Sequence, residues 1–328
     1  MISRRLAVLV LVLGALVAPL AADAQGPARV PRIGYLVLSP LVDPPSAERQ
    51  AFLEGLRELG YVVGQNLAIE YRSANWNREL LPDLAEELVS LKVDVIVAVP
   101  GAVEAARQAT RTTPIIIPAM ESPVESGLVA TLARPGGNIS GTAWGSRGID
   151  GKRLQLLKET VPRISKVAVL WNPEVLGVRS QWQETQVSAG RLGLTPESYE
   201  VRDPKDFPGV LTAMMRKRPD ALITFVSPLT TAYRPIIVEF ATKHRLPTMF
   251  ATRADVEGGG LIAYAAHIGD LFRRAAPYVD RILKGARPGD LPVEEPTRFE
   301  LVVNLRTARA LGITIPPSVL IRADTVVE

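Results

Sequence analysis

A short buried strand followed by an amphipathic helix recurs along the first half of this chain, and the same order recurs in the second half. Residues 33–38 form a continuous apolar run, which is typical of a strand buried on both faces of a parallel sheet. Residues 48–59 then carry apolar side chains at helical spacing and end at Gly60, where a left-handed cap would end a helix. The first half is expected to hold strands at 33–38, 67–71, 94–99, 115–117 and 139–144, and helices at 48–59, 82–91 and 102–109.

The second half repeats this order at nearly constant offsets. Strands are expected at 167–170, 198–201, 221–225, 248–250 and 261–264, and helices at 180–192 and 210–217. The corresponding pairs are Gly60 with Gly193, Asp94 with Asp220, and Pro114 with Pro247. Repeated βα units with right-handed crossovers build a parallel sheet with helices on both faces, so two such sets predict two lobes.

The last part of the chain is expected to join these lobes. A long amphipathic helix at 268–284 is followed by a Pro-rich linker, a strand at 299–303 and a helix at 307–311. We predict an α/β fold with two Rossmann-like lobes, each with a parallel sheet, joined by a multi-strand hinge. Lobe 1 is predicted to comprise residues 31–143 plus about 266–290, and lobe 2 residues 144–265 plus about 297–328.

Residues 1–24 have the features of a secretory signal peptide. Arg4 and Arg5 precede a short apolar run, and the small residues Ala22 and Ala24 predict cleavage before Gln25. That run is short for a bilayer core of about 30 Å, and no later run approaches about 18 uninterrupted apolar residues. We therefore expect export to the periplasm and no stable membrane insertion after cleavage.

Composition excludes several kinds of site. The chain has no cysteine, which rules out disulfides, a thiolate nucleophile and a cysteine-based metal site. The two histidines have no metal-ligand spacing, and no phosphate loop, dinucleotide fingerprint or nucleophile elbow is present, so we expect no metal and no cofactor. Basic residues number 38 against 34 acidic ones and are scattered, so no nucleic-acid partner is expected.

The loops that follow the strands are the expected binding region. Ligands of open parallel sheets bind beyond the carboxyl ends of the strands, where helix N-termini offer free N–H groups. These loops are short and rich in small, polar and proline residues, and aromatic residues near the strand ends could form a wall against a ligand. The candidate binding residues are Ser39, Pro100, Gly101, Ala102, Glu121, Ser122, Trp144, Asn172, Ser227, Thr252 and Tyr264.

Four runs together carry a family resemblance. They are GQNLAIEYR at 64–72, VDVIV at 93–97, LARPGGN at 132–138 and LPVEEPTRFELVVN at 291–304. With these runs the chain resembles the ABC-transporter substrate-binding family that includes the tryptophan-binding TrpX-type proteins. The resemblance covers residues 31–328 and implies the periplasmic-binding protein type 1 fold. It also implies a non-catalytic receptor that closes on a small organic ligand and presents it to an ABC permease in the cytoplasmic membrane.

Two positions depart from the family pattern. Family members commonly carry Asp where this chain has Ser122, and often where it has Ser227, so an acidic contact to a ligand amine is missing there. The ligand class therefore stays open between amino acids and other small organic molecules. We expect a monomer. A secreted α/β enzyme using Glu121 or Asp255, and a ligand sensor for a membrane signalling partner, remain alternatives; a repressor core would need a DNA-binding segment where residues 1–30 offer a signal.

Overall fold

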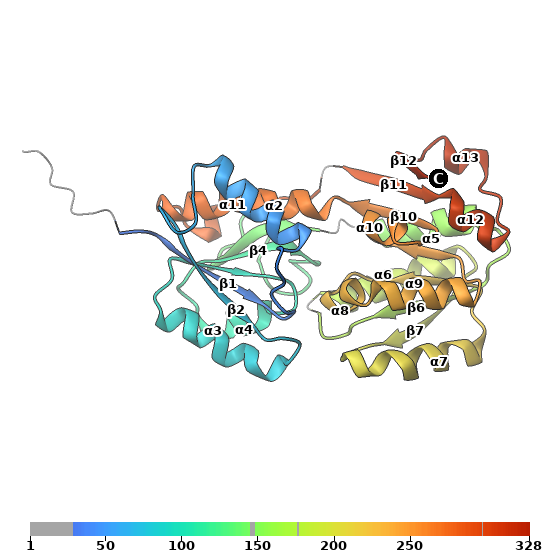
Figure 1. The fold of residues 1–328 in the computed structure, drawn as a ribbon, viewed down its shortest axis with the longest axis horizontal. Coiled ribbons are helices and arrows are strands. Elements are labelled where there is room, and N and C mark those ends of the chain that lie inside the picture. The colour runs from blue at the N-terminus through green and yellow to red at the C-terminus, as the bar shows by residue number, and fades with distance from the viewer. Residues whose placement is uncertain (1–28, 145–147, 176, 297) are drawn as a thin grey trace, which may run out of the picture. The chain divides into compact units, whose positions relative to one another are not determined.

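The computed structural model describes residues 29–144, 148–175, 177–296 and 298–328. The chain divides into two compact units, Met1–Val30 and Pro31–Glu328, and the fold below is that of the second unit. The expected signal peptide at 1–24 and its cleavage site before Gln25 lie outside the described residues. Within the second unit the strands form two separate sheets, each the centre of an α/β lobe (Figure 1).

The first lobe is built on a five-stranded parallel sheet with the order β2-β1-β3-β4-β5. Alternate side chains of β1 point to opposite faces, so Ile33 and Tyr35 join one buried cluster and Leu36 joins the other. Helices α2 and α11 cover the first of these faces, and α3 and α4 cover the second. The elements are β1 (Arg32–Val37), α2 (Ala47–Glu58), β2 (Ala68–Ser73), η1 (Arg78–Leu80), α3 (Leu81–Ser90), β3 (Val95–Ala98), α4 (Val103–Ala109), β4 (Ile115–Met120), β5 (Ile139–Ala143) and α11 (Ile268–Leu283).

The second lobe has a seven-stranded sheet with the order β12-β11-β10-β9-β8-β6-β7. Its β7-β6-β8-β9-β10 part repeats the strand order of the first lobe, with helices again on both faces. The elements are α5 (Ile149–Thr160), β6 (Lys166–Trp171), α6 (Val178–Arg191), β7 (Thr195–Glu200), η2 (Pro204–Asp206), α7 (Phe207–Lys217), β8 (Ala221–Thr224), α8 (Pro228–Ala232), α9 (Arg234–Lys243), β9 (Thr248–Phe250), α10 (Arg253–Glu257), β10 (Ile262–Ala266), β11 (Phe299–Asn304), α12 (Leu305–Leu311), α13 (Pro317–Leu320) and β12 (Thr325–Val327). The short helix η3 (Pro288–Asp290) packs on β5 of the first lobe.

The three residue pairs expected from the repeat occupy equivalent places. The carboxylate of Asp94 accepts a hydrogen bond from the backbone of Arg32 at the start of β1 (2.7 Å), and Asp220 accepts one from Lys166 at the start of β6 (2.8 Å). Gly60 and Gly193 both take left-handed backbone angles after α2 and α6. The carbonyls of Pro114 and Pro247 accept hydrogen bonds from Ile96 and Leu222 in the neighbouring strands. The two lobes therefore share one construction plan.

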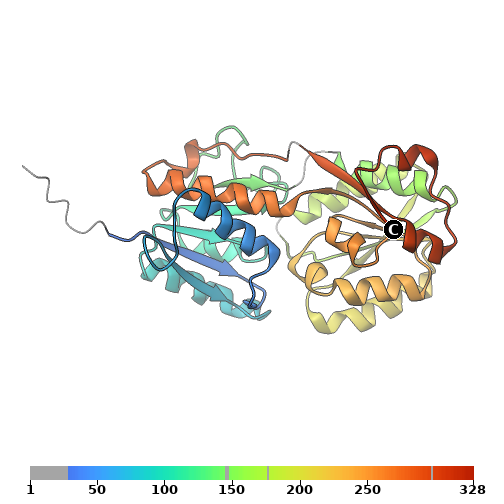
Figure 2. The ribbon, with the colours of Figure 1, turned by 45° about the horizontal axis from the view of Figure 1, so that its top comes forward.

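The prediction of parallel sheets holds for β1 to β10 but not for β11 and β12, which run in the opposite direction. Strand β11 pairs with β10 in antiparallel fashion, with Phe299 opposite Ala266. Helix α11 separates β10 from β11 in the chain but packs on the first lobe. The chain therefore returns to the second sheet beside the end of β10, and β11 runs in the opposite direction. Figure 2 shows the last part of the chain, in red, alongside the second lobe, whereas the orange helix α11 lies along α2 of the first. The predicted residue limits of the two lobes remain predictions.

Candidate functional site

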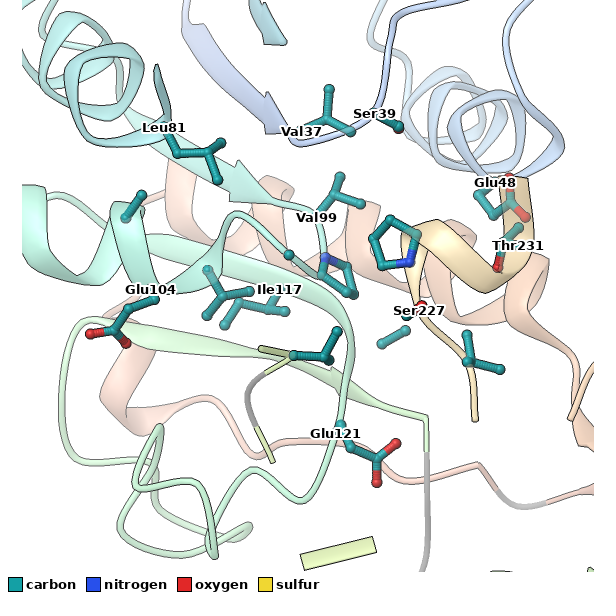
Figure 3. A pocket seen from close by; sticks show the side chains of 18 of the residues that line it. Val37, Ser39, Glu48, Leu81, Val99, Glu104, Ile117, Glu121, Ser227 and Thr231 are labelled. Carbon is teal, nitrogen blue, oxygen red and sulfur yellow. The ribbon is translucent and has the colours of Figure 1, made fainter. Parts of the chain in front are cut away.

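A cavity of about 670 Å³ lies between the two lobes and is lined by both. It opens at the two places where the strand order reverses, between β1 and β3 in the first lobe and between β6 and β8 in the second. Such reversals leave a crevice at the carboxyl ends of the strands, because the crossover helices on either side go to opposite faces. We call this cavity, with its lining residues, the cleft (Figure 3).

The wall of the cleft is mostly apolar, with a few hydroxyl and charged groups. This composition suits a small organic molecule with an apolar body and a limited number of polar atoms. Its apolar lining residues include Tyr35, Val37, Trp76, Leu81, Val99, Ile117, Met120, Leu128, Val226 and Phe272. Its hydroxyl and charged lining residues include Ser39, Ser46, Glu48, Arg78, Glu104, Glu121, Glu174, Ser227 and Thr231.

Six of the predicted binding residues line the cleft. They come from both lobes and from five separate loops, which follow β1, β3, β4, β5 and β8. They are Ser39, Pro100, Gly101, Glu121, Trp144 and Ser227.

The other five predicted residues lie outside the lining and have other contacts. Ala102 is buried ahead of α4, and Asn172 is buried below the cleft, where its side chain accepts a hydrogen bond from the backbone of Glu174 (3.0 Å). Ser122 donates to Glu121 (3.3 Å). Thr252 caps α10, and the ring of Tyr264 stacks on Phe299 with 5.7 Å between centroids.

Glu121 is held at the end of β4 by an irregular stretch of backbone. The pairing of β4 with β5 shifts register between Ile117 and Met120, and Ala119 (φ 66°) and Ser122 (φ 39°) both take left-handed angles. Left-handed angles are uncommon for residues other than glycine, and strained positions of this kind gather at functional sites. Trp144 donates its indole N–H to one carboxyl oxygen of Glu121, and Ser122 donates to the other.

The environment of Glu121 disfavours its charged form. Burial raises the pKa of Glu121 to about 7, and the nearby carboxylate of Asp150 adds to this rise, whereas Arg153 opposes it. Arg153 is itself only 1% exposed; it pairs with Asp150 (2.9 Å), donates to the carbonyl of Tyr264 (2.9 Å) and lies 5.0 Å from the centre of the Trp144 ring. Glu121 therefore stands between the cleft and a buried charged cluster in the second lobe.

Four charged lining residues were not expected from the sequence, namely Glu48, Arg78, Glu104 and Glu174. Arg78, in the first lobe, forms an ion pair with Glu174 of the second lobe (2.9 Å), and Glu48 lies near the start of α2. Arg78 and Glu174 are far apart along the chain and their partnership depends on the meeting of two lobes, so no local pattern signals it. Glu48 follows the loop after β1. It would have been among the predicted binding residues if the predicted binding region had included the first turn of the helix after each loop.

Among the residues that the structure describes, no group of three or more histidine or acidic side chains could hold a metal ion. No helix in the same residues is long and apolar enough to cross a membrane. What the cleft offers is a shaped apolar space with hydrogen-bonding groups from two lobes.

The family model described as ABC transporter substrate binding protein matches residues 38–327. The chain belongs to the ABC transporter substrate-binding family. This confirms the resemblance found in the sequence, and the family implies a small-molecule ligand and an ABC permease as partner. The architecture is that of the type 1 periplasmic-binding proteins, as predicted.

Two relatives are known with an aromatic amino acid, and a third is known without ligand. A tyrosine-binding protein of Clostridioides difficile (strain R20291) is 29% identical over 280 residues, which cover 84% of this chain and 80% of the relative. The ABC domain of Streptococcus pneumoniae in complex with L-Trp is 26% identical, with a TM-score of 0.83, and the match covers 90% of this chain and 99% of that one. The ligand-free, open structure of CD0873 from Clostridium difficile is also 26% identical, with a TM-score of 0.63 over 91% and 99% of the two chains.

Proposed function

We propose that this substrate-binding protein captures a small organic ligand, amino-acid-like or related, by closing its two lobes around it and then delivers it to an ABC permease. The observation that carries the proposal is the cleft lined by both lobes at both strand-order reversals. A ligand that contacts both lobes stabilises the closed arrangement, whereas a ligand that contacts one lobe does not. The ligands of the two relatives, tyrosine and L-Trp, support an amino-acid-like ligand.

The comparison of TM-scores supports a closing movement. At the same 26% identity, the chain superposes better on the complex with L-Trp (0.83) than on the ligand-free, open structure (0.63). We propose that the six lining residues Ser39, Pro100, Gly101, Glu121, Trp144 and Ser227 contact the ligand. We further propose that the lobes divide at about residues 143–144, 265–266 and 290–297, and that the chain bends there.

The test is ligand-dependent closure. Native mass spectrometry of protein purified without refolding should find a co-purified small molecule, and adding that molecule to stripped protein should raise Tm and reduce the scattering radius. Failure of every small-molecule pool extracted from the producing cells to change Tm would contradict the proposal. Release of a chemically altered product would instead support the enzyme alternative.

Location and assembly form a second part of the proposal. Substrate-binding proteins of this family are extracytoplasmic, and we propose export by residues 1–24 with cleavage before Gln25. The mature protein is proposed to be a monomer without a cofactor. Intact mass of protein from the extracytoplasmic fraction should begin at Gln25, and light scattering should give the mass of one chain. A mature protein that keeps residues 1–24 would contradict the export proposal.

A further inference from the structure

The charged lining of the cleft has more carboxylates than cations. Its charged residues are Glu48, Arg78, Glu104, Glu121 and Glu174, so Arg78 is the one Lys or Arg among the described lining residues. The guanidinium of Arg78 forms an ion pair with Glu174 (2.9 Å). Glu104 has its own partner in Arg107 (2.6 Å), on the same helix. Glu48 and Glu121 are left without an ion pair to any Lys or Arg in the described part of the chain.

The cluster behind Glu121 is also short of positive charge. Among the described residues that surround Glu121, Asp150 and Arg153 on α5 are the charged ones, and Arg153 is hydrogen-bonded to Asp150. Gln181 on α6 donates a further hydrogen bond to Asp150 (2.9 Å). Two carboxyl groups therefore face a single guanidinium, and the raised pKa of Glu121, caused first by burial and then by Asp150, reflects that missing cation.

The carboxyl group of Glu121 is nevertheless oriented as an acceptor. Trp144 and Ser122 donate to different oxygens of the group, and the left-handed Ala119 and Ser122 determine its direction. The residue remains partly accessible, and it lines the cleft beside the Trp144 side chain. In Figure 3, Glu121 lies apart from Glu48, with Ser227 between them in that view. An ammonium at this position would meet a carboxylate and an aromatic ring together.

We propose that the cleft takes an organic cation with an apolar body, and that Glu121 receives its ammonium group. This inference rests on the proposed function, since it names the ligand class of the same cleft. A ligand carboxylate would find only hydroxyl groups, amide groups and an already paired Arg78 in the described lining. The ammonium is therefore the required charged group, and a carboxylate on the same molecule is dispensable.

The test uses nine probes. Each of three apolar groups is tested as an amine, as an amino acid and as a carboxylate. The amines are tryptamine, phenethylamine and isoamylamine; the amino acids are tryptophan, phenylalanine and leucine; the carboxylates are indole-3-propionate, 3-phenylpropionate and 4-methylpentanoate. For at least one apolar group, the amine should bind within about tenfold of its amino acid, and the carboxylate should bind at least about a hundredfold more weakly. Calorimetry on the full mature protein gives the Kd values.

The role of Glu121 is tested by Glu121→Gln, which keeps the shape and the acceptor oxygen but removes the charge. Amine affinity should fall by about a hundredfold in this variant. Asp280→Asn, which removes a buried carboxylate outside the cleft lining, should leave the Kd unchanged. At pH 6, binding of the amine to the unaltered protein should release close to one proton, measured in buffers of different ionisation enthalpy, and Glu121→Gln should release none.

Each outcome decides between the proposals. Tighter binding of a carboxylate than of its amine, or unchanged amine affinity in Glu121→Gln, would overturn the inference and leave the proposed function standing. Binding of an amino acid without measurable binding of its amine would overturn it as well. If none of the nine probes and no cell-extract pool binds, the proposed function fails, and the inference fails with it.

Discussion

Gly177, immediately before α6, lies against the backbone carbonyl of Glu121, so that a Cβ at position 177 would come well under 3.0 Å from that oxygen. The contact joins the second lobe to the loop after β4, which carries a lining residue of the cleft. Gly177 also has a left-handed backbone (φ 86°). The position therefore needs glycine both for its backbone angle and for the approach of the two lobes.

Gly177→Ala is expected to weaken ligand binding because it forces the loop after β4 away from α6. Gly148→Ala is the matched control, since Gly148 precedes α5 with nearly the same backbone angle (φ 87°) but has nothing within 4 Å of its Cβ position. Both variants should lose about 1–2 kcal/mol of stability from the left-handed angle. Only Gly177→Ala should also raise Kd, by about tenfold or more. Denaturant unfolding and calorimetry check this, and equal Kd values for the two variants would contradict it.

The stability of the ligand-free protein should fall as pH rises because of Glu121. The pKa of Glu121 is raised to about 7, so between about pH 4.5 and 7 the folded state holds a proton that the unfolded state has lost. The contribution of Glu121 to the free energy of unfolding is fully present below about pH 4.5 and is lost as pH rises through about 7. Glu121→Gln removes the decline, so the variant should be more stable than the unaltered protein at pH 8, by about 1–3 kcal/mol. Urea unfolding of both proteins at pH 5 and pH 8 measures the difference, and a pH-independent difference would count against it.

The ion pair between Arg78 and Glu174 should favour closure. One terminal nitrogen of Arg78 is already buried without a hydrogen-bond partner among the described residues, so losing Glu174 would leave the guanidinium poorly compensated. Both side chains remain partly exposed, so Glu174→Gln should weaken ligand binding by only about two- to fivefold. The loss should shrink at high salt, because salt screens exposed pairs. Glu257→Gln, which removes an ion pair to Arg253 within the second lobe (2.7 Å) and away from the cleft lining, should not change Kd at any salt concentration.

Gly55 on α2 should resist a change that normally stabilises helices. Replacing an exposed helical glycine by alanine stabilises a helix by about 0.5–1 kcal/mol. At Gly55, however, the new Cβ would lie 2.6 Å from the carbonyl oxygen of Arg273 on α11, so Gly55→Ala should destabilise the protein instead. Gly190→Ala on α6 is the control, since nothing lies within 4 Å of its Cβ position. Thermal unfolding should show Tm changes of opposite sign, and two increases would refute the close packing of α2 and α11.

Helix α5, whose buried face carries two charged residues, was not predicted from the sequence. Helix α5 buries Asp150 and Arg153 together with leucines, so its apolar period is interrupted by residues that normally lie at the surface. Their burial is possible only because they pair with each other and because the carbonyl of Tyr264 accepts from Arg153. Neither partner is recognisable from the local sequence of α5. The long helix α11 also buries one acidic residue, Asp280, but it was predicted nearly to its ends because its many buried apolar residues recur at helical spacing.

The candidate site was predicted in part. Strand-end loops gave Ser39, Glu121 and Ser227 as lining residues, because the carboxyl ends of parallel strands must open onto the same edge. The sequence did not distinguish these from Thr252, which caps α10, because capping and binding use the same small hydroxyl residues. The interlobe partners Arg78 and Glu174 were missed altogether.

The sequence by itself determined that the chain forms two α/β lobes with the same order of strands and helices. Apolar periodicity and glycine caps act within a few residues, so they can be recognised in the sequence without knowing the tertiary structure. The similarity of the two halves is evident from the order of the residues alone, because Gly60 corresponds to Gly193 and Asp94 corresponds to Asp220. Which charges meet was decided only by the tertiary structure. A carboxylate such as Glu121 acquires its character from Trp144, Asp150 and Arg153, and electrostatic and packing forces between distant segments depend on distances that sequence separation does not give.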